Sequence, residues 1–243
     1  MDILYGRNPV LEALRAGRTA RKLVIAEGLQ PDPRVAEIVS LAGSAAITVE
    51  EVPRRRLDDI AHNEHHQGVA GYFHSRQPLQ IEELLQRARD PALLLVLDGI
   101  QDPQNVGAIT RTAEACGVDG IVLARRGSAA VTPAVAKTSA GASEHVPYAV
   151  AGNLARALDV AGQHGLRRVG LDAKASQRYD QVDYTGPLVV VLGAEGAGMT
   201  SAVRSACDEL VFLPMLGRIE SLNVGASAAV LLYEVQRQRR FRR

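Results

Sequence analysis

Six short apolar runs after residue 90 place the strongest constraint on the fold of this chain. Most of them are continuous rather than alternating between apolar and polar residues, as in strands that are covered on both faces. The runs span residues 93–97, 121–124, 146–150, 169–171, 188–192 and 210–213. Helix-like segments separate nearly all of them, at residues 106–116, 133–143, 154–164 and 201–207. This alternation predicts an α/β domain with a mostly parallel sheet sandwiched by helices.

The first 75 residues predict a smaller α/β unit. Its apolar spacing indicates three helices and three strands, the helices at 9–16, 33–42 and 57–62 and the strands at 22–26, 46–49 and 68–73. A polar, proline-containing stretch at 75–79 follows, and an amphipathic helix is expected at 81–88. We therefore expect a domain at 1–75, a linker with a first helix at 76–90, and a larger domain at 91–243.

Composition excludes several classes of protein. The 243 residues are 47% hydrophobic and 23% charged, as expected of a globular protein. No apolar run approaches the ~20 residues of a membrane span, and the N-terminus does not resemble a signal peptide. Cys116 and Cys207 have neither disulfide nor metal-site spacing. These features predict a cytoplasmic protein with reduced thiols and neither a membrane nor a metal partner.

Two local patterns leave alternatives open. His62, His65 and His66 suggest a metal site, but polar helix ends commonly have such a composition, and we favour that interpretation. The net charge is only +1, yet arginines cluster at 54–56 and five more occur between 237 and 243. Such clusters are either solvated surface, favoured at a helix C-terminus, or contacts to RNA.

Three polar, glycine-containing loops follow predicted strands, at residues 98–105, 193–198 and 215–223. The carboxyl ends of parallel strands meet at one edge of a sheet, where ligands bind in such folds. In the third loop, Ser221 and Asn223 open an apolar helical run, so they either cap that helix or contact a ligand. The sequence therefore predicts a ligand site built by these loops.

Arg111 is a lone cation on the otherwise largely apolar helix after the first loop. It either forms a structural ion pair with Glu114 or Asp98, or it holds a phosphate or a developing oxyanion. The glycines of the second loop lack the order of a dinucleotide fingerprint, and no phosphate-binding Gly-Lys-Ser/Thr pattern occurs.

The three loops and their flanks resemble, in order and spacing, the three motifs of the SpoU (TrmH-type) RNA ribose 2′-O-methyltransferases. The segments are DPQNVGAITRTAEACG (102–117), LGAEGAGMT (192–200) and LPMLGRIESLNVGASAAVLLYE (213–234). Two N-terminal segments are similar to the substrate-binding domain of the subgroup that methylates a guanosine of 23S rRNA. These are YGRNPVLEAL (5–14) and HQGVAGY (66–72), so the resemblance covers nearly the whole chain.

The resemblance implies a homodimer that binds S-adenosylmethionine in a deep C-terminal trefoil knot, with an L30e-like RNA-binding domain before it. General folding rules would not predict this knot, because knots are nearly absent among folds. The implied cofactor contacts are Gly193, Leu213, Met215, Gly217 and Leu222. The implied catalytic residues are Asn105, Arg111, Glu195, Ser221 and Asn223.

Some residues depart from the family pattern: Ala197 stands where a lysine is frequent, Gly225 where a serine is frequent, and Thr110 where an apolar residue is common. None of them is in the implied catalytic set. The resemblance implies methylation of a guanosine ribose in 23S rRNA. The alternatives are a tRNA or another rRNA site as substrate, and a non-catalytic RNA-binding module of ribosome assembly.

Overall fold

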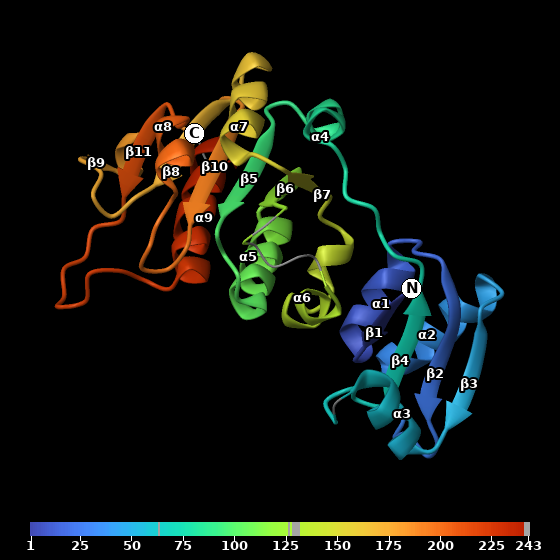
Figure 1. The fold of residues 1–243 in the computed structure, drawn as a ribbon. Coiled ribbons are helices and arrows are strands. Elements are labelled where there is room, and N and C mark those ends of the chain that lie inside the picture. The colour runs from blue at the N-terminus through green and yellow to red at the C-terminus, as the bar shows by residue number, and fades with distance from the viewer. Residues whose placement is uncertain (63, 126, 128–131, 241–243) are drawn as a thin grey trace. The chain divides into compact units, whose positions relative to one another are not determined.

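The chain folds into two compact units (Figure 1). Unit 1 comprises Met1–Gln77 and the described residues of Val131–His145, and unit 2 comprises the described remainder. The chain thus passes from one unit to the other three times. The computed structural model describes residues 1–62, 64–125, 127 and 132–240. Among these residues, no helix combines the length and apolar character that a bilayer span requires.

Unit 1 is built on a mixed sheet with the strand order β1-β4-β2-β3. Strand β4 is antiparallel to β1 and β2, and β3 is parallel to β2. The strands are β1 (Asp2–Tyr5), β2 (Ala20–Ala26), β3 (Thr48–Val52) and β4 (Val69–Phe73). The helical elements are α1 (Arg7–Arg15), α2 (Pro33–Ser44), α3 (Arg54–Ala61), α6 (Pro133–Thr138) and the 3₁₀ turn η1 (Ala142–Glu144).

Strand alternation divides the core of unit 1 into two layers. Leu23 of β2 and Phe73 of β4 pack with apolar residues of α1 and α2, and Ala136 of α6 belongs to the same cluster. On the other face, Leu57 of α3 packs against Val24 and its neighbours. Unit 1 is therefore a three-layer unit whose core includes a segment from the second half of the chain.

Unit 2 contains a seven-stranded sheet with the order β7-β6-β5-β10-β8-β11-β9, in which every described strand pair is parallel. This confirms the predicted α/β fold. The strands are β5 (Leu93–Asp98), β6 (Gly120–Ala124), β7 (Tyr148–Ala151), β8 (Arg167–Leu171), β9 (Gln177–Arg178), β10 (Leu188–Gly193) and β11 (Glu209–Phe212).

Helices cover both faces of this sheet. The helical elements are α4 (Ile81–Arg87), α5 (Pro103–Ala115), α7 (Leu154–Gln163), η2 (Tyr179–Gln181), α8 (Ser201–Ser205) and α9 (Val224–Arg240). On one face, Leu84, Leu158 and Val203 of α4, α7 and α8 pack with Val96 and Val189 of the strands. Helices α5 and α9 pack on each other, and α9 contacts β10.

The neighbouring strands β5 and β10 form the switch point of the sheet. From β5 the chain continues to β6 on one side, whereas from β10 it continues to β11 on the other. Gly193 at the end of β10 lies opposite Asp98 at the end of β5. Ligands of open α/β sheets bind at such a point, outside the carboxyl ends of the strands.

The helix predicted at 133–143 is interrupted. Helix α6 ends at Thr138, and Ala140 and Gly141 adopt positive φ angles of 53° and 91° before η1. Left-handed backbone ends an α-helix because its carbonyls no longer align. The short strands β1 and β9 were not predicted.

The two basic clusters differ in structure. Arg54–Arg56 form the exposed first turn of α3. By contrast, the guanidinium of Arg239 donates hydrogen bonds to four main-chain carbonyls at the amino ends of β5 and β10, those of Pro91, Ala92, Tyr184 and Gly186. Arg239 therefore anchors the end of α9, which argues against a role for it in RNA contact. Arg242 and Arg243 lie outside the described residues.

His66 has a structural role. Its ring is fully buried, its Nδ1 accepts a hydrogen bond from the Gly68 N–H, and its Nε2 lies 2.8 Å from Asp58 Oδ1. These contacts engage both ring nitrogens. Among the described residues, no cluster of three or more His, Cys, Asp or Glu is arranged to hold a metal ion.

Candidate functional site

Asn223 caps helix α9. Its Oδ1 accepts hydrogen bonds from the N–H groups of Gly225 at 2.9 Å and Ala226 at 3.3 Å. The helix begins at Val224, so of the two polar residues predicted to open it, Asn223 is the cap. Ser221 lies two residues before the cap, is exposed, and has no hydrogen bond to any described residue.

The amide nitrogen of Asn223 joins the remaining two loops through hydrogen bonds. Its Nδ2 donates to Glu195 Oε1 at 2.7 Å and to Asn105 Oδ1 at 2.8 Å. The Val224 N–H donates to the same Glu195 oxygen at 3.1 Å. Asn105, Glu195 and Asn223 therefore form one cluster, which we call the three-loop cluster. The N-terminus of a helix stabilises a carboxylate placed in this way.

A tight turn presents Glu195. The main chains of Ala194 and Gly198 exchange two hydrogen bonds, of 3.0 and 2.8 Å, and Gly196 and Gly198 have positive φ angles. A Cβ atom on Gly193 would collide with the backbone of Gly198 and Met199. The steric need for glycine at position 193 thus arises within the chain, before any ligand is considered.

Asp98 holds this turn to strand β5. Its carboxylate is 6% exposed, and its Oδ2 accepts hydrogen bonds from the Thr200 N–H at 2.7 Å and the Thr200 hydroxyl at 2.8 Å. Asp98 opens the first predicted loop, but neither Asp98 nor Thr200 is among the individual site residues predicted from the sequence. The available signal was an acidic residue closing the apolar run LLLVLD, because a buried carboxylate requires hydrogen-bond donors.

Helix α5 brings Asn105 to the cluster in its first turn. Asp102 caps this helix by accepting from the Gln104 N–H at 2.9 Å, and Pro103 follows as the first helical residue. A Cβ on Gly225 would lie 3.3 Å from Ala108 Cβ and 3.1 Å from Asn223 Oδ1. Glycine at position 225 therefore lets α9 approach α5 closely without crowding the cap.

Thr110 is accommodated inside α5. It is buried, and its hydroxyl donates to the Val106 carbonyl at 2.7 Å. This hydrogen bond satisfies the polar group that replaces the more common apolar residue.

Arg111 is exposed and forms neither a hydrogen bond nor an ion pair within the described part of the chain. The structure therefore supports neither of the two ion pairs considered for Arg111, with Glu114 or with Asp98. Asp98 instead accepts hydrogen bonds from Thr200. It also does not bring Arg111 into the three-loop cluster. A guanidinium of this kind is available to an anionic ligand.

The loop after β11 carries the remaining predicted contacts. Residues 213–222 make no hydrogen bond to the main chain of any described residue, so their peptide groups depend on water or a ligand. Leu213 and Met215 are half-buried, and Gly217 is exposed. Three apolar side chains of the loop are exposed, Leu216 completely, Ile219 at 76% and Leu222 at 44%. This combination fits an amphipathic ligand such as S-adenosylmethionine.

The model of the SpoU rRNA Methylase family matches residues 92–233, more than half of the chain. The chain belongs to the SpoU rRNA methylase family. A second family model, RNA 2′-O ribose methyltransferase substrate binding, matches residues 3–79.

Two relatives that match nearly the whole of this chain agree with the SpoU assignment. A protein of Mycolicibacterium vanbaalenii named as an uncharacterized tRNA/rRNA methyltransferase is 46% identical over 242 residues, covering 98% of this chain and 77% of the relative. A solved structure of an RNA 2′-O ribose methyltransferase is 28% identical, has a TM-score of 0.81, and covers 97% of this chain and 88% of its own.

A third similarity concerns the fold alone. The SpoU methyltransferase AviRb from Streptomyces viridochromogenes, solved with its cofactor AdoMet, is 24% identical with a TM-score of 0.81. The match covers 97% of this chain and 89% of AviRb. As a member of the SpoU rRNA methylase family, this chain is an RNA methyltransferase that depends on S-adenosylmethionine. The sulfonium of this cofactor carries a methyl group that is already activated.

Proposed function

We propose that this SpoU methyltransferase methylates a ribose 2′-hydroxyl of RNA, and that its substrate is a guanosine of 23S rRNA. The observation that carries the proposal is the three-loop cluster, in which one amide joins Asn105 and Glu195 to the cap of α9. The match of residues 3–79 to a 2′-O ribose substrate-binding model supports the ribose as acceptor. The resemblance of the N-terminal segments to the 23S rRNA subgroup supports the guanosine.

Glu195 is the residue best placed to receive the proton of the acceptor hydroxyl. A ribose hydroxyl is a weak nucleophile, so catalysis requires alignment with the methyl group and removal of one proton. Glu195 Oε1 accepts two hydrogen bonds, whereas Oε2 accepts none from the described residues. The bonds at Oε1 orient the carboxylate and leave Oε2 for the substrate or a bridging water.

Arg111 has a different role in this proposal. A guanidinium stays protonated at any working pH and therefore does not act as the base. It holds a phosphate next to the target ribose and stabilises negative charge on the 2′-oxygen. Its lack of a partner among the described residues supports this role. Ser221, exposed two residues before the cap, is proposed to contact the substrate.

The cofactor would be held by the loops that follow β10 and β11. The proposed contacts come from main-chain groups and side chains at Gly193, Leu213, Met215, Gly217 and Leu222. The uncommitted peptide groups of residues 213–222, in the loop after β11, support this assignment. We also propose, from the family resemblance, that this region forms the trefoil knot and that the enzyme acts in the cytoplasm. Residues 1–75 are proposed to contain an L30e-like RNA-binding domain, and residues 91–243 to contain the catalytic domain.

A homodimer is part of the proposal. Exposed apolar side chains lie on the loop before α9 and on α9 itself, namely Leu216, Ile219, Leu222, Val230 and Tyr233. Such residues are typical of a surface that a partner covers. A second copy would bury a total of more than about 1,200 Å² in a stable interface. Light scattering at micromolar concentration tests this, and a monomer mass would contradict it.

Methyl transfer to defined RNAs tests the substrate. Labelled S-adenosylmethionine is incubated with the full-length enzyme and either unmodified 23S rRNA or unmodified tRNA. We expect incorporation into 23S rRNA at a guanosine, and none into tRNA. Incorporation into tRNA or at another rRNA site would support the alternative that the enzyme methylates a different RNA site. RNA binding without any incorporation would support the alternative of a non-catalytic RNA-binding module.

A further inference from the structure

Residues 132–145 lie between two strands of the methyltransferase sheet, β6 and β7, but they belong to unit 1. The family model for the methylase covers them, within its match to 92–233. The substrate-binding model ends at residue 79. The segment therefore lies within the match to the methylase model, whereas in the structure it belongs to the compact unit of the substrate-binding match.

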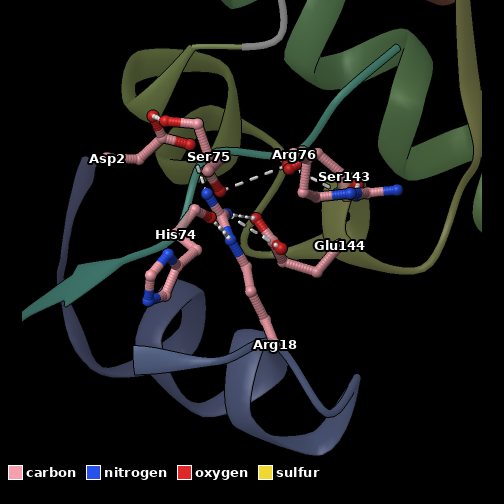
Figure 2. A network of polar contacts seen from close by, with 9 residues as sticks. Asp2, Arg18, His74, Ser75, Arg76, Ser143 and Glu144 are labelled. Atoms are coloured by element: carbon pink, nitrogen blue, oxygen red, sulfur yellow. Dashed lines mark hydrogen bonds and ion pairs between the residues drawn. The ribbon is translucent and has the colours of Figure 1, made fainter. Parts of the chain in front are cut away.

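A buried ion pair fixes the segment to unit 1 (Figure 2). Arg18 Nη1 lies 2.9 and 3.1 Å from the two carboxylate oxygens of Glu144, and the side chains are 8% and 4% exposed. The same guanidinium donates to the His74 carbonyl at 3.0 Å and to Asp2. Figure 2 shows Arg18 between these partners. The first 75 residues supply only some of the hydrogen-bond acceptors around its guanidinium, and Glu144 supplies the others.

Other contacts extend along the segment. Lys137 donates to the His65 carbonyl at 3.1 Å, and its ammonium lies 4.7 Å from the centre of the Tyr5 ring. His145 Nε2 lies 2.7 Å from Glu12 Oε2. Arg76 donates to the Ser143 carbonyl, as Figure 2 also shows.

Close packing accompanies these polar contacts. Ala136 is 2% exposed within the main core cluster of unit 1. A Cβ on Gly141 would lie 2.7 Å from the Glu12 side chain and 3.1 Å from the Asn8 carbonyl oxygen. Gly141 therefore combines a left-handed conformation with a close approach to α1, and few other residues meet both requirements.

Burial makes this attachment different from a loop resting on a surface. A carboxylate loses its hydration when it is buried, and only a well-placed cation with further hydrogen bonds compensates for that loss. Without Arg18, Glu144 would be a buried anion with no cation among the described residues, and without Glu144 the mostly buried Arg18 would lose one of its two carboxylate partners. The segment and the first 77 residues therefore depend on each other.

We propose that residues 132–145 are a functional part of the RNA-binding unit, which requires them to fold and to bind RNA. The proposal rests on the proposed RNA-binding role of unit 1. It makes this unit discontinuous in sequence and joins it to the methyltransferase sheet by three chain connections. One of them leads from β6, the neighbour of β5, which ends in Asp98 at the candidate site.

Native-state hydrogen exchange of the full-length wild-type protein tests the structural part of the proposal. Amides that open together share the same dependence on denaturant concentration. We expect the amides of α6 and η1 to share this dependence with those of α1 and β4. If the exchange of these amides instead depends on denaturant in the same way as that of the amides of β6 and β7, the segment belongs to the methyltransferase unit and the proposal is wrong.

Two variants of full-length protein test the function, with a matched control. Glu144→Gln keeps an acceptor for Arg18, and Glu144→Ala removes it. Glu37→Ala is the control, because Glu37 makes a similar two-bond contact to Arg15, at 2.8 Å each, on the exposed surface. We expect Glu144→Ala to weaken the binding of a 23S rRNA fragment at least 10-fold, Glu144→Gln to weaken it less, and Glu37→Ala to leave it unchanged.

Binding of S-adenosylmethionine by each variant is measured alongside and is expected to stay unchanged. If Glu144→Ala does not fold, Glu144→Gln and the wild-type exchange experiment still decide the outcome. Wild-type affinity for RNA in both Glu144 variants would overturn the proposal. A wild-type protein that fails to bind any RNA would instead refute the proposed function itself.

Discussion

Asn223 Nδ2 donates a hydrogen bond of 2.7 Å to Oε1 of Glu195, a residue 28 positions earlier in the chain. The contact joins the cap of α9 to the turn after β10. Because Oδ1 of the same amide accepts from the N–H groups of Gly225 and Ala226, hydrogen bonds at both its oxygen and its nitrogen fix the orientation of the amide. A local helix cap is in this way also the centre of the candidate site.

Asn223→Ala is expected to affect stability and activity to different extents. Loss of the cap should cost about 1 kcal/mol of unfolding free energy. Loss of the Glu195 contact should lower methyl transfer by on the order of 10²-fold. Asn153→Ala is the matched control, because Asn153 caps α7 through the Arg156 N–H at 3.1 Å. Chemical denaturation and transfer rates are compared, and equal rate losses in both variants would contradict a catalytic role for Asn223.

Asp98 is expected to position Glu195 through Thr200. Asp98→Ala leaves the Thr200 N–H without its acceptor and should destabilise the protein by roughly 1–3 kcal/mol. It should also lower kcat more than it raises KM for RNA, because the turn carrying Glu195 loses its attachment. Asp98→Asn keeps an acceptor and should lose less. Unchanged kcat in a folded Asp98→Ala enzyme would show that this hydrogen bond only stabilises the fold.

Arg111→Ala should leave stability within about 0.5 kcal/mol of wild type, because Arg111 is exposed and has no described partner. Methyl transfer should fall by about 10²-fold with unchanged S-adenosylmethionine affinity. Arg111→Lys should restore activity only in part, because lysine lacks the planar fork that binds phosphate. Arg156→Ala, at an exposed arginine of α7, is the control. Wild-type turnover by Arg111→Ala would rule out its catalytic role.

The two cysteines should make the free energy of unfolding depend on pH in the alkaline range. Burial raises the pKa of Cys116 and that of Cys207 to about 11. An unfolded thiol loses its proton near pH 8.5, so above this pH the folded state holds more protons and stability falls as pH rises. We expect a loss of roughly 2 kcal/mol per thiol by pH 10. Denaturation curves measured from pH 8 to 10 give the free energy of unfolding at each pH. This free energy should fall less steeply with pH in a Cys116→Ala, Cys207→Ala variant than in the wild type, and an equally steep fall would contradict this explanation.

Periodicity predicts the elements of this protein better than their arrangement. Continuous apolar runs are a local property, and all six that were identified correspond to strands β5, β6, β7, β8, β10 and β11. The insertion of β10 between β5 and β8 depends on pairing between distant segments, which no local pattern records. Strand β9 has only two residues, too few for a periodic signal.

The discontinuity of unit 1 has no local signal either. The pair that fixes it, Arg18 and Glu144, is separated by 126 residues. Its consequence for truncation is direct: removal of residues 1–75 alone leaves Glu144 without Arg18. A methyltransferase fragment designed from the structure should therefore also lack residues 132–145.

The candidate site was predictable where its residues follow strands. The loops of Asn105, Glu195 and Asn223 could be located from their position after apolar runs. Their direct contact depends on the packing of α9 against α5. Side-chain burial was less accessible to sequence analysis: the basic composition of the C-terminal end does not distinguish Arg239, bonded to four carbonyls, from the exposed Arg240 beside it.

The position of the transferred methyl group tests the central claim most directly. The full-length enzyme is incubated with S-adenosylmethionine and unmodified 23S rRNA, and the product is digested to nucleosides for mass spectrometry. We predict a single new guanosine whose added methyl group remains with the ribose when the glycosidic bond is broken. A methyl group that remains with the base would contradict the proposed chemistry.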